Sequence, residues 1–177
     1  MVHTGPIQNV QSNDIACNGA SNGGGVAPAS TPYIINVTAG STVQLTWRHT
    51  LTSDSSDILD SSHKGPIMAY MKSVSNALTD TGVGAGWFKV QQEGYNNATG
   101  VWGTTNMIAA KGIQQVTIPK CIKNGQYLLR GEVLALHAGM SIQALMMRSA
   151  NNLLQRALAA VHSSMFVSSA PPSQTCC

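Results

Sequence analysis

The sequence predicts an all-β fold, an antiparallel β-sandwich, and three observations carry this prediction. Several short segments alternate apolar and polar residues with a period of two. Glycine, with 17 of the 177 residues, and clusters of Ser, Asn and Asp separate these segments. A helical period appears only after Gly139. Many short strands with frequent turns and little helix are typical of a sandwich.

The first two strands follow a loop. Residues 18–32 are rich in Gly, Ser, Ala and Pro, which predicts irregular structure. Apolar side chains then recur at every second position in residues 33–38 and again in 43–47. The Ala-Gly-Ser sequence between them, residues 39–41, predicts a turn, so we expect these two strands to form a β-hairpin.

The remaining strands are expected at 67–72, 87–90, 113–118 and 126–137, after a Ser/Asp-rich loop. The last is a nearly continuous apolar run that contains Arg130 and Glu132. A buried charge must be paired or hydrogen-bonded, so both side chains are expected to have partners and a structural role.

The chain changes character after the last strand. Apolar residues in 142–161 follow a period of 3.6, which predicts an amphipathic helix. Residues 168–177 are of low complexity and are expected to be disordered. The sequence thus predicts a sandwich domain over 1–138 and a divergent tail over 139–177.

Composition excludes several classes of function. Only 10% of the residues are charged, and no basic run is present, so we expect no nucleic-acid partner. No segment approaches the ~20 apolar residues that span a bilayer, so we expect no membrane partner. Seven acidic residues offer no evident carboxylate pair for glycoside hydrolysis, and no nucleophile-elbow motif supports a serine hydrolase.

Other features favour an extracellular protein. Asn36 and Asn97 each begin an N-glycosylation sequon. Residues 1–7, by contrast, show no signal-peptide pattern.

Three pairings are open to the four cysteines, which are Cys17, Cys121, Cys176 and Cys177.

Six strings of the sequence carry a resemblance to a known family. They occupy residues 4–10, 12–18, 62–70, 86–90, 116–122 and 125–137, and they include Ser-His-Lys-Gly-Pro and Ala-Leu-His. In order and rough spacing, residues 4–138 resemble the fungal lytic polysaccharide monooxygenases of auxiliary-activity family nine, formerly glycoside hydrolase family 61.

The resemblance implies a fold and a function. Members of that family have an immunoglobulin- or fibronectin III-like sandwich and are secreted copper enzymes. They oxidise a C–H bond at a glycosidic linkage of cellulose or a related β-1,4-glucan, with an oxygen co-substrate and an external electron donor. One copper ion is held by a histidine brace, made by the amine and imidazole of the mature N-terminal histidine and by a second histidine, with an axial tyrosine.

Two residues carry over onto this chain. His63 matches the second copper ligand, and imidazole is a ligand type that copper(II) favours. His137 matches the family's outer-sphere histidine, which hydrogen-bonds the oxygen species, so the resemblance implies a catalytic role for it.

The sequence also departs from the family. His3 lies 14 positions before Cys17, where the family has several tens of residues, so we expect the family's N-terminal portion to be missing. After His137, Gln143 could replace the family's glutamine, but no tyrosine follows it. The usual disulfide partner of Cys17 is absent as well. The chain is therefore expected to be such a monooxygenase by ancestry, and the alternatives are a non-catalytic extracellular β-sandwich that at most binds polysaccharide, or an aberrant product that folds poorly.

Overall fold

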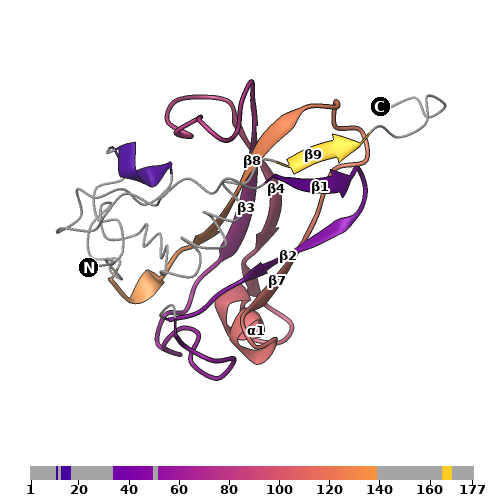
Figure 1. The fold of residues 1–177 in the computed structure, drawn as a ribbon. Helices are drawn as coiled ribbons and strands as arrows, with labels where there is room; N and C mark the ends of the chain where they lie inside the picture. Colours follow the sequence, from indigo (N-terminus) through magenta and orange to yellow (C-terminus); the bar gives the residue numbers. More distant parts are fainter. Residues whose placement is uncertain (1–10, 12, 17–33, 50–51, 139–164, 169–177) are drawn as a thin grey trace.

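Two β-sheets pack face to face in the computed structural model, which describes residues 11, 13–16, 34–49, 52–138 and 165–168 (Figure 1). The predicted β-sandwich is therefore confirmed. The larger sheet has five strands in the order β1-β9-β8-β3-β4, and the smaller sheet pairs β2 with β7. All strand pairs in the two sheets are antiparallel apart from β1 with β9, among the residues that the structure describes.

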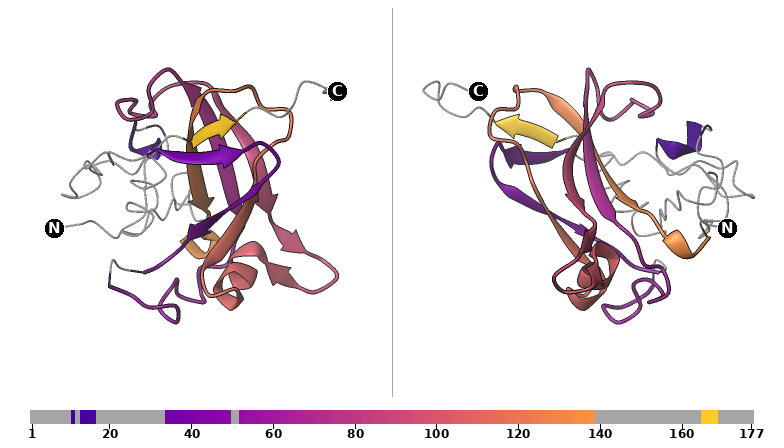
Figure 2. Two further views of the ribbon diagram at one scale, coloured as in Figure 1. Left: turned by 45° about the vertical axis from the view of Figure 1, so that its right-hand side comes forward. Right: turned by 180° about the vertical axis from the view of Figure 1, so that it is seen from behind.

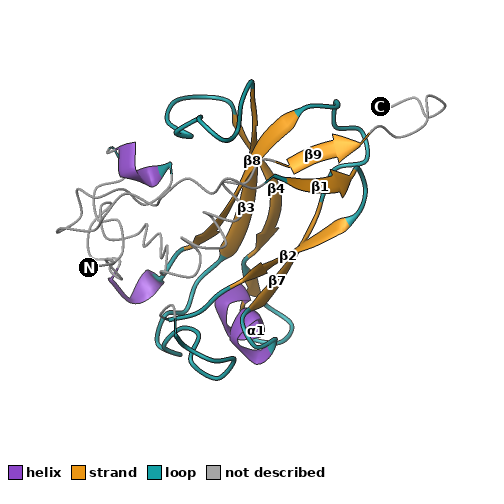
Figure 3. Ribbon diagram, viewed as in Figure 1, coloured by secondary structure: helices purple, strands orange, loops and turns teal. Residues whose placement is uncertain are grey.

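The elements have the following bounds (Figure 3). The strands of the larger sheet are β1 (Ile35–Thr38), β9 (Met165–Ser168), β8 (Gln126–Val133), β3 (Ile67–Val74) and β4 (Trp87–Glu93). The smaller sheet contains β2 (Thr42–Thr46) and β7 (Ile113–Thr117). A separate hairpin joins β5 (Tyr95–Asn96) to β6 (Val101–Trp102), and the helices are η1 (Asn13–Ile15), α1 (Gly103–Ala109) and η2 (Leu136–Ala138).

The core lies between the two sheets. Leu45 and Val116 from the smaller sheet pack with Met71 and Leu129 from the larger one, and all four are at most 1% exposed. A second cluster surrounds the buried Trp47 and also includes the strand residues Ile67 and Val133 and Met107 of α1. The alternation of strands β2, β3 and β7 thus places their apolar faces against one another.

The predicted hairpin over 33–47 is wrong, although the turn at 39–41 is present. Strand β1 pairs with β9 and strand β2 pairs with β7, so the chain crosses from one sheet to the other at this turn. Gly40 has φ of +84°, which favours glycine. Val37 and Leu45 both face the core from opposite sides. Alternation shows which face of a strand is buried, but it does not show which strand pairs with it. The hairpin prediction therefore failed.

Strand β8 is shorter than the predicted 126–137, since it ends at Val133. Seven of its eight residues are buried, because both of its faces are covered, and this explains the near-continuous apolar run. The regular ladder stops where Leu134 meets Pro66. The Leu134 N–H still donates to the Pro66 carbonyl at 3.0 Å, but proline has no N–H to return the bond.

Arg130 and Glu132 lie on the outer face of β8 and have partners, as predicted. Their side chains form an ion pair with 3.6 Å between Nη2 and Oε2. Arg130 Nη1 also donates to the Ile15 carbonyl at 3.1 Å. The guanidinium lies 4.4 Å from the ring centroid of Trp87 and 4.9 Å from that of Tyr70, at cation–π distance.

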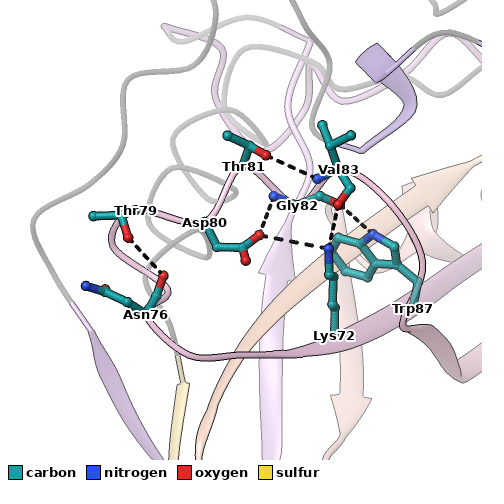
Figure 4. A network of polar contacts seen from close by, with 8 residues as sticks. All are labelled: Lys72, Asn76, Thr79, Asp80, Thr81, Gly82, Val83 and Trp87. Carbon is teal, nitrogen blue, oxygen red and sulfur yellow. Dashed lines mark hydrogen bonds and ion pairs between the residues drawn. The ribbon is translucent and has the colours of Figure 1, made fainter.

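The loop that joins β3 to β4 is fixed by polar contacts to both strands (Figure 4). Lys72 Nζ donates to the Val83 carbonyl at 2.7 Å and lies 3.9 Å from Asp80 Oδ1. Trp87 Nε1 donates to the Gly82 carbonyl at 2.8 Å. These contacts hold the loop against β3 and β4, which belong to the same sheet as Arg130.

Several expectations concern residues outside the described part. The predicted helix over 142–161 and the cysteines Cys17, Cys176 and Cys177 lie there, whereas Cys121 is disulfide-bonded. Within the predicted tail, the described residues 165–168 form β9. Among the described residues, no helix is long and apolar enough to cross a membrane.

Candidate functional site

His63 lies in the loop that precedes β3. Its backbone N–H donates to the Asp60 carbonyl at 3.0 Å, and the carboxylate of Asp60 accepts the Ser62 N–H at 2.8 Å. The hydroxyl and the N–H of Ser62 hold the pKa of the Asp60 carboxyl below its ordinary value, and the charges of His63 and His137 act in the same direction. The loop therefore presents an ionised carboxylate near both imidazoles.

The register of β3 with β8 brings His63 opposite His137. Ile67 is paired with Val133, and the pairing continues beyond the strands, because Leu136 N–H donates to the Lys64 carbonyl at 2.9 Å. The next residues in this antiparallel register are His63 and His137. Two central strands of the larger sheet thus position both predicted site residues.

Gly65 makes this close approach feasible. A Cβ at Gly65 would lie 1.7 Å from the Leu134 carbonyl oxygen, so only glycine fits. Its N–H donates to Thr104 Oγ1 at 3.0 Å, and its carbonyl accepts the Thr104 N–H at 3.1 Å. Helix α1 thereby fixes the chain two residues after His63.

The two imidazoles form an edge-to-face pair. Their ring centroids are 4.6 Å apart, and the ring planes are inclined at 80°. His137, at the turn of η2, is exposed, whereas His63 is half-buried. His63 Nδ1 is buried and has no hydrogen-bond partner among the described residues. A buried ring nitrogen without a protein partner is free to bind a ligand.

This donor set fits part of a copper site. Imidazole nitrogens suit copper, and the site lies at the protein surface, where a co-substrate has access. No group of three or more His, Cys, Asp or Glu side chains that could hold a metal occurs in the described part of the chain.

Of the remaining histidines, the structure describes His49. His49 is exposed, and its Nδ1 lies 3.2 Å from Asp57 Oδ1. This is an ordinary contact of a surface histidine. His3, Gln143 and His162 lie outside the described residues. The sequons are at the surface, with Asn36 in β1 and Asn97 in the turn of the β5–β6 hairpin.

Sequence reasoning missed two contributors, Asp60 and Thr104. Asp60 has an Asx-type signal, since an aspartate two residues before a serine accepts that residue's N–H. Thr104 has no comparable signal. Its helix has seven residues, too few for a helical period to be recognised.

A family comparison decides the classification. The model of Auxiliary Activity family 9 (formerly GH61) matches residues 1–146. The chain belongs to this family. The resemblance inferred from six sequence strings is therefore confirmed, and the histidine pair lies within the matched region.

Relatives and solved structures agree with Auxiliary Activity family 9. AA9 family lytic polysaccharide monooxygenase A of Neurospora crassa is 56% identical over 141 residues, which are 78% of this chain and 41% of that protein. Monooxygenase C of Thermothelomyces thermophilus is 53% identical over 138 residues, which are 76% of this chain and 56% of that protein. The chain thus spans about half the length of the curated relatives it matches.

The solved structure of CvAA9A matches 78% of this chain and 57% of its own, with a TM-score of 0.67 and 30% identity. Cel61B from Hypocrea jecorina, a glycoside hydrolase family 61 member, matches 84% of this chain and 60% of its own, with a TM-score of 0.58 and 25% identity. Both likenesses support the β-sandwich.

Proposed function

We propose that this Auxiliary Activity family 9 chain carries part of the active site of an extracellular, copper-dependent monooxygenase. The reaction is the oxidative cleavage of cellulose or a related β-1,4-glucan, with an external electron donor. The single observation that supports it most directly is the pair of imidazoles with centroids 4.6 Å apart, one with a buried, unpartnered Nδ1. The names of the relatives favour this function over a non-catalytic binding module.

Each histidine has a distinct role in the proposal. His63 is a copper ligand, and the bonds of Gly65 to Thr104 limit its movement. His137 is exposed beside it, so its imidazole hydrogen-bonds the oxygen co-substrate and exchanges protons with it. Copper, when bound, supplies the one-electron chemistry that C–H oxidation requires.

Copper titration of the full chain tests the ligand assignment. The copper(II) electron paramagnetic resonance spectrum should show nitrogen ligation. In His63→Ala, the dissociation constant for copper measured by isothermal calorimetry should rise at least tenfold. His49→Ala is the matched control, because His49 is exposed and paired with Asp57 away from the site. Uptake that survives His63→Ala unchanged would refute the assignment.

Activity separates the roles of the two histidines. Incubation with cellulose, oxygen, copper and ascorbate should release oxidised cello-oligosaccharides, which mass spectrometry detects. His137→Ala should keep copper binding and lower product formation by about 10²-fold or more, the usual size of a lost acid–base contribution. Equal product from wild type and His137→Ala would contradict a catalytic role for His137.

A further inference from the structure

The β5–β6 hairpin carries a rigid turn outside both sheets (Figure 2). The Gly100 N–H donates to the Asn96 carbonyl at 2.8 Å, and Gly100 has φ of +70°. Asn96 Oδ1 accepts the N–H groups of Ala98 at 2.9 Å and Thr99 at 3.3 Å. Because Asn96 supplies these bonds, the neighbouring Asn97 side chain is left exposed to solvent at the tip.

The side chain of Tyr95 lies along the same hairpin, and its hydroxyl reaches the turn. Its hydroxyl is 3.7 Å from the position that a Cβ of Gly100 would occupy. Its ring centroid is 5.0 Å from that of Trp102, and the side chain is still 50% exposed. Asn97 is two residues further on, so the Cα atoms of Tyr95 and Asn97 are at most about 7 Å apart. An exposed aromatic face therefore lies within reach of a group attached to Asn97.

We propose that Asn97 is N-glycosylated and that the first N-acetylglucosamine packs on the ring of Tyr95. Asn97, Ala98 and Thr99 form the acceptor sequon. A sugar ring has one face of C–H groups, which suits an aromatic face with an apolar body and a polar tip. The absence of a side chain at Gly100 leaves room beside the phenol.

The transfer of the glycan to Asn97 involves no oxidation or reduction. A lipid-linked oligosaccharide pyrophosphate of the secretory pathway is the donor. The bond from sugar C1 to Asn97 Nδ2 forms, the bond from C1 to the pyrophosphate oxygen breaks, and Nδ2 loses one proton. The lipid pyrophosphate is the leaving group. This step rests on the proposed function only in that the chain must enter the secretory pathway.

The second sequon offers a contrast within the same chain. Asn36 is exposed as well, but it lies inside β1, where it is paired with Phe166 of β9. Its backbone is an extended strand, not a turn closed by its own hydrogen bonds. Sequons that are used lie on surface loops, so the structure assigns the packed glycan to Asn97.

Peptide mapping tests occupancy. The full 177-residue chain, secreted from a eukaryotic host behind a host leader, is treated with peptide N-glycosidase in ¹⁸O-water and mapped by mass spectrometry. Asn97 should carry the label, both Asn97→Gln and Thr99→Ala should abolish it, and Asn36→Gln should leave it unchanged. An unlabelled Asn97 in the secreted, folded chain would overturn the proposal.

Melting experiments test the packing. A chain trimmed to the first N-acetylglucosamine should melt about 2–4 °C above the fully stripped chain. The difference should vanish in Tyr95→Thr, persist in Tyr95→Phe, and persist in Phe88→Thr, which removes another exposed aromatic. The N-acetyl methyl resonance should also show a ring-current shift that Tyr95→Thr removes. Equal stabilisation and an unchanged resonance in Tyr95→Thr would refute the packing.

The two proposals fail separately. Occupancy and melting need neither copper nor glucan, so they are decided even if the chain takes up no metal. Conversely, Asn97→Gln should leave copper uptake by the chain unchanged, since the hairpin contributes no atom to the His63–His137 pair.

Discussion

His63 and His137 show how two residues far apart in sequence come into contact. His63 is in a loop and His137 is in η2, yet hydrogen bonds at Lys64 and Pro66 continue the β3–β8 register up to them. Their 4.6 Å separation is thus a property of the sheet. The residue that tolerates least change is accordingly Gly65, which separates the two bonded residues.

Gly65→Ala should destabilise the protein and disturb the histidine pair. The added Cβ would lie 1.7 Å from the Leu134 carbonyl oxygen, so the strands must separate, at a cost of about 1–3 kcal/mol. Denaturant unfolding measures this loss. Gly94→Ala is the control, because no heavy atom lies within 4 Å of its added Cβ. A Gly65→Ala protein as stable as Gly94→Ala would contradict the close approach.

Asp54 offers a pH-dependent test in the loop between β2 and β3. Its Oδ1 accepts the Ser56 hydroxyl at 2.6 Å and the Ser56 N–H at 2.7 Å, and these bonds lower its pKa below 3.8. A lowered carboxyl pKa means that the stabilisation is present above the unfolded pKa. It is lost as the pH falls through the folded value.

Ser56→Ala should therefore raise the pKa of Asp54 toward its ordinary value. An NMR titration between about pH 2 and 6, which follows the resonance of the Asp54 carboxyl carbon, measures this pKa. Ser62→Ala is the matched control, since Ser62 acts on Asp60 in the same way. If Ser56→Ala leaves the titration of Asp54 where it was, the bond from the Ser56 hydroxyl does not cause the shift, since the N–H of residue 56 still donates in this variant.

At the scale of elements, alternation identified most strands but not their neighbours. Strands β2, β3 and β7 lie close to their predicted bounds, because each has buried or half-buried residues at alternate positions, whereas β4 has no buried residue and extends three residues beyond its predicted end at Val90. Pairing depends on which strands share a core, and this information is distributed along the chain. The sequence therefore could not show that β1 and β2 lie in different sheets, or that residues 63 and 137 meet. Resemblance supplied the identities of the two histidines, and only the register supplied their proximity.

Gln114 of β7 connects the two sheets by polar contacts. It is 2% exposed, its Oε1 accepts Trp47 Nε1 at 2.8 Å, and its Nε2 donates to Gln91 Oε1 on β4 at 2.8 Å. Gln114→Leu leaves the buried indole N–H unsatisfied, which should cost about 1–3 kcal/mol in denaturant unfolding. Gln115→Leu, on the exposed face of the same strand, should change stability by about 0.5 kcal/mol or less. Similar losses for both variants would show that the buried bonds contribute nothing.

At the scale of the whole molecule, the two core clusters should unfold together. Leu129 belongs to the first cluster and Val133 to the second, and both are in β8. Leu129→Ala should therefore lower stability by about 2–5 kcal/mol and shift the entire transition. Tryptophan fluorescence in a background with Trp87→Phe and Trp102→Phe, which leaves Trp47 of the second cluster as the emitter, and far-UV circular dichroism should give coincident curves. Separate midpoints would show that the clusters are independent.

The crossing at residues 39–41 affects the order in which the chain can fold. Because β2 does not pair with its neighbour β1, it must wait for β7, and Thr42 meets Thr117 only after 75 residues of chain have been added. During synthesis, the apolar side of β2 is exposed until the ribosome has released that later segment. Folding dominated by such distant pairings is slow, on the order of milliseconds to seconds. Slower translation or lower temperature should accordingly raise the yield of native protein more than stronger expression does.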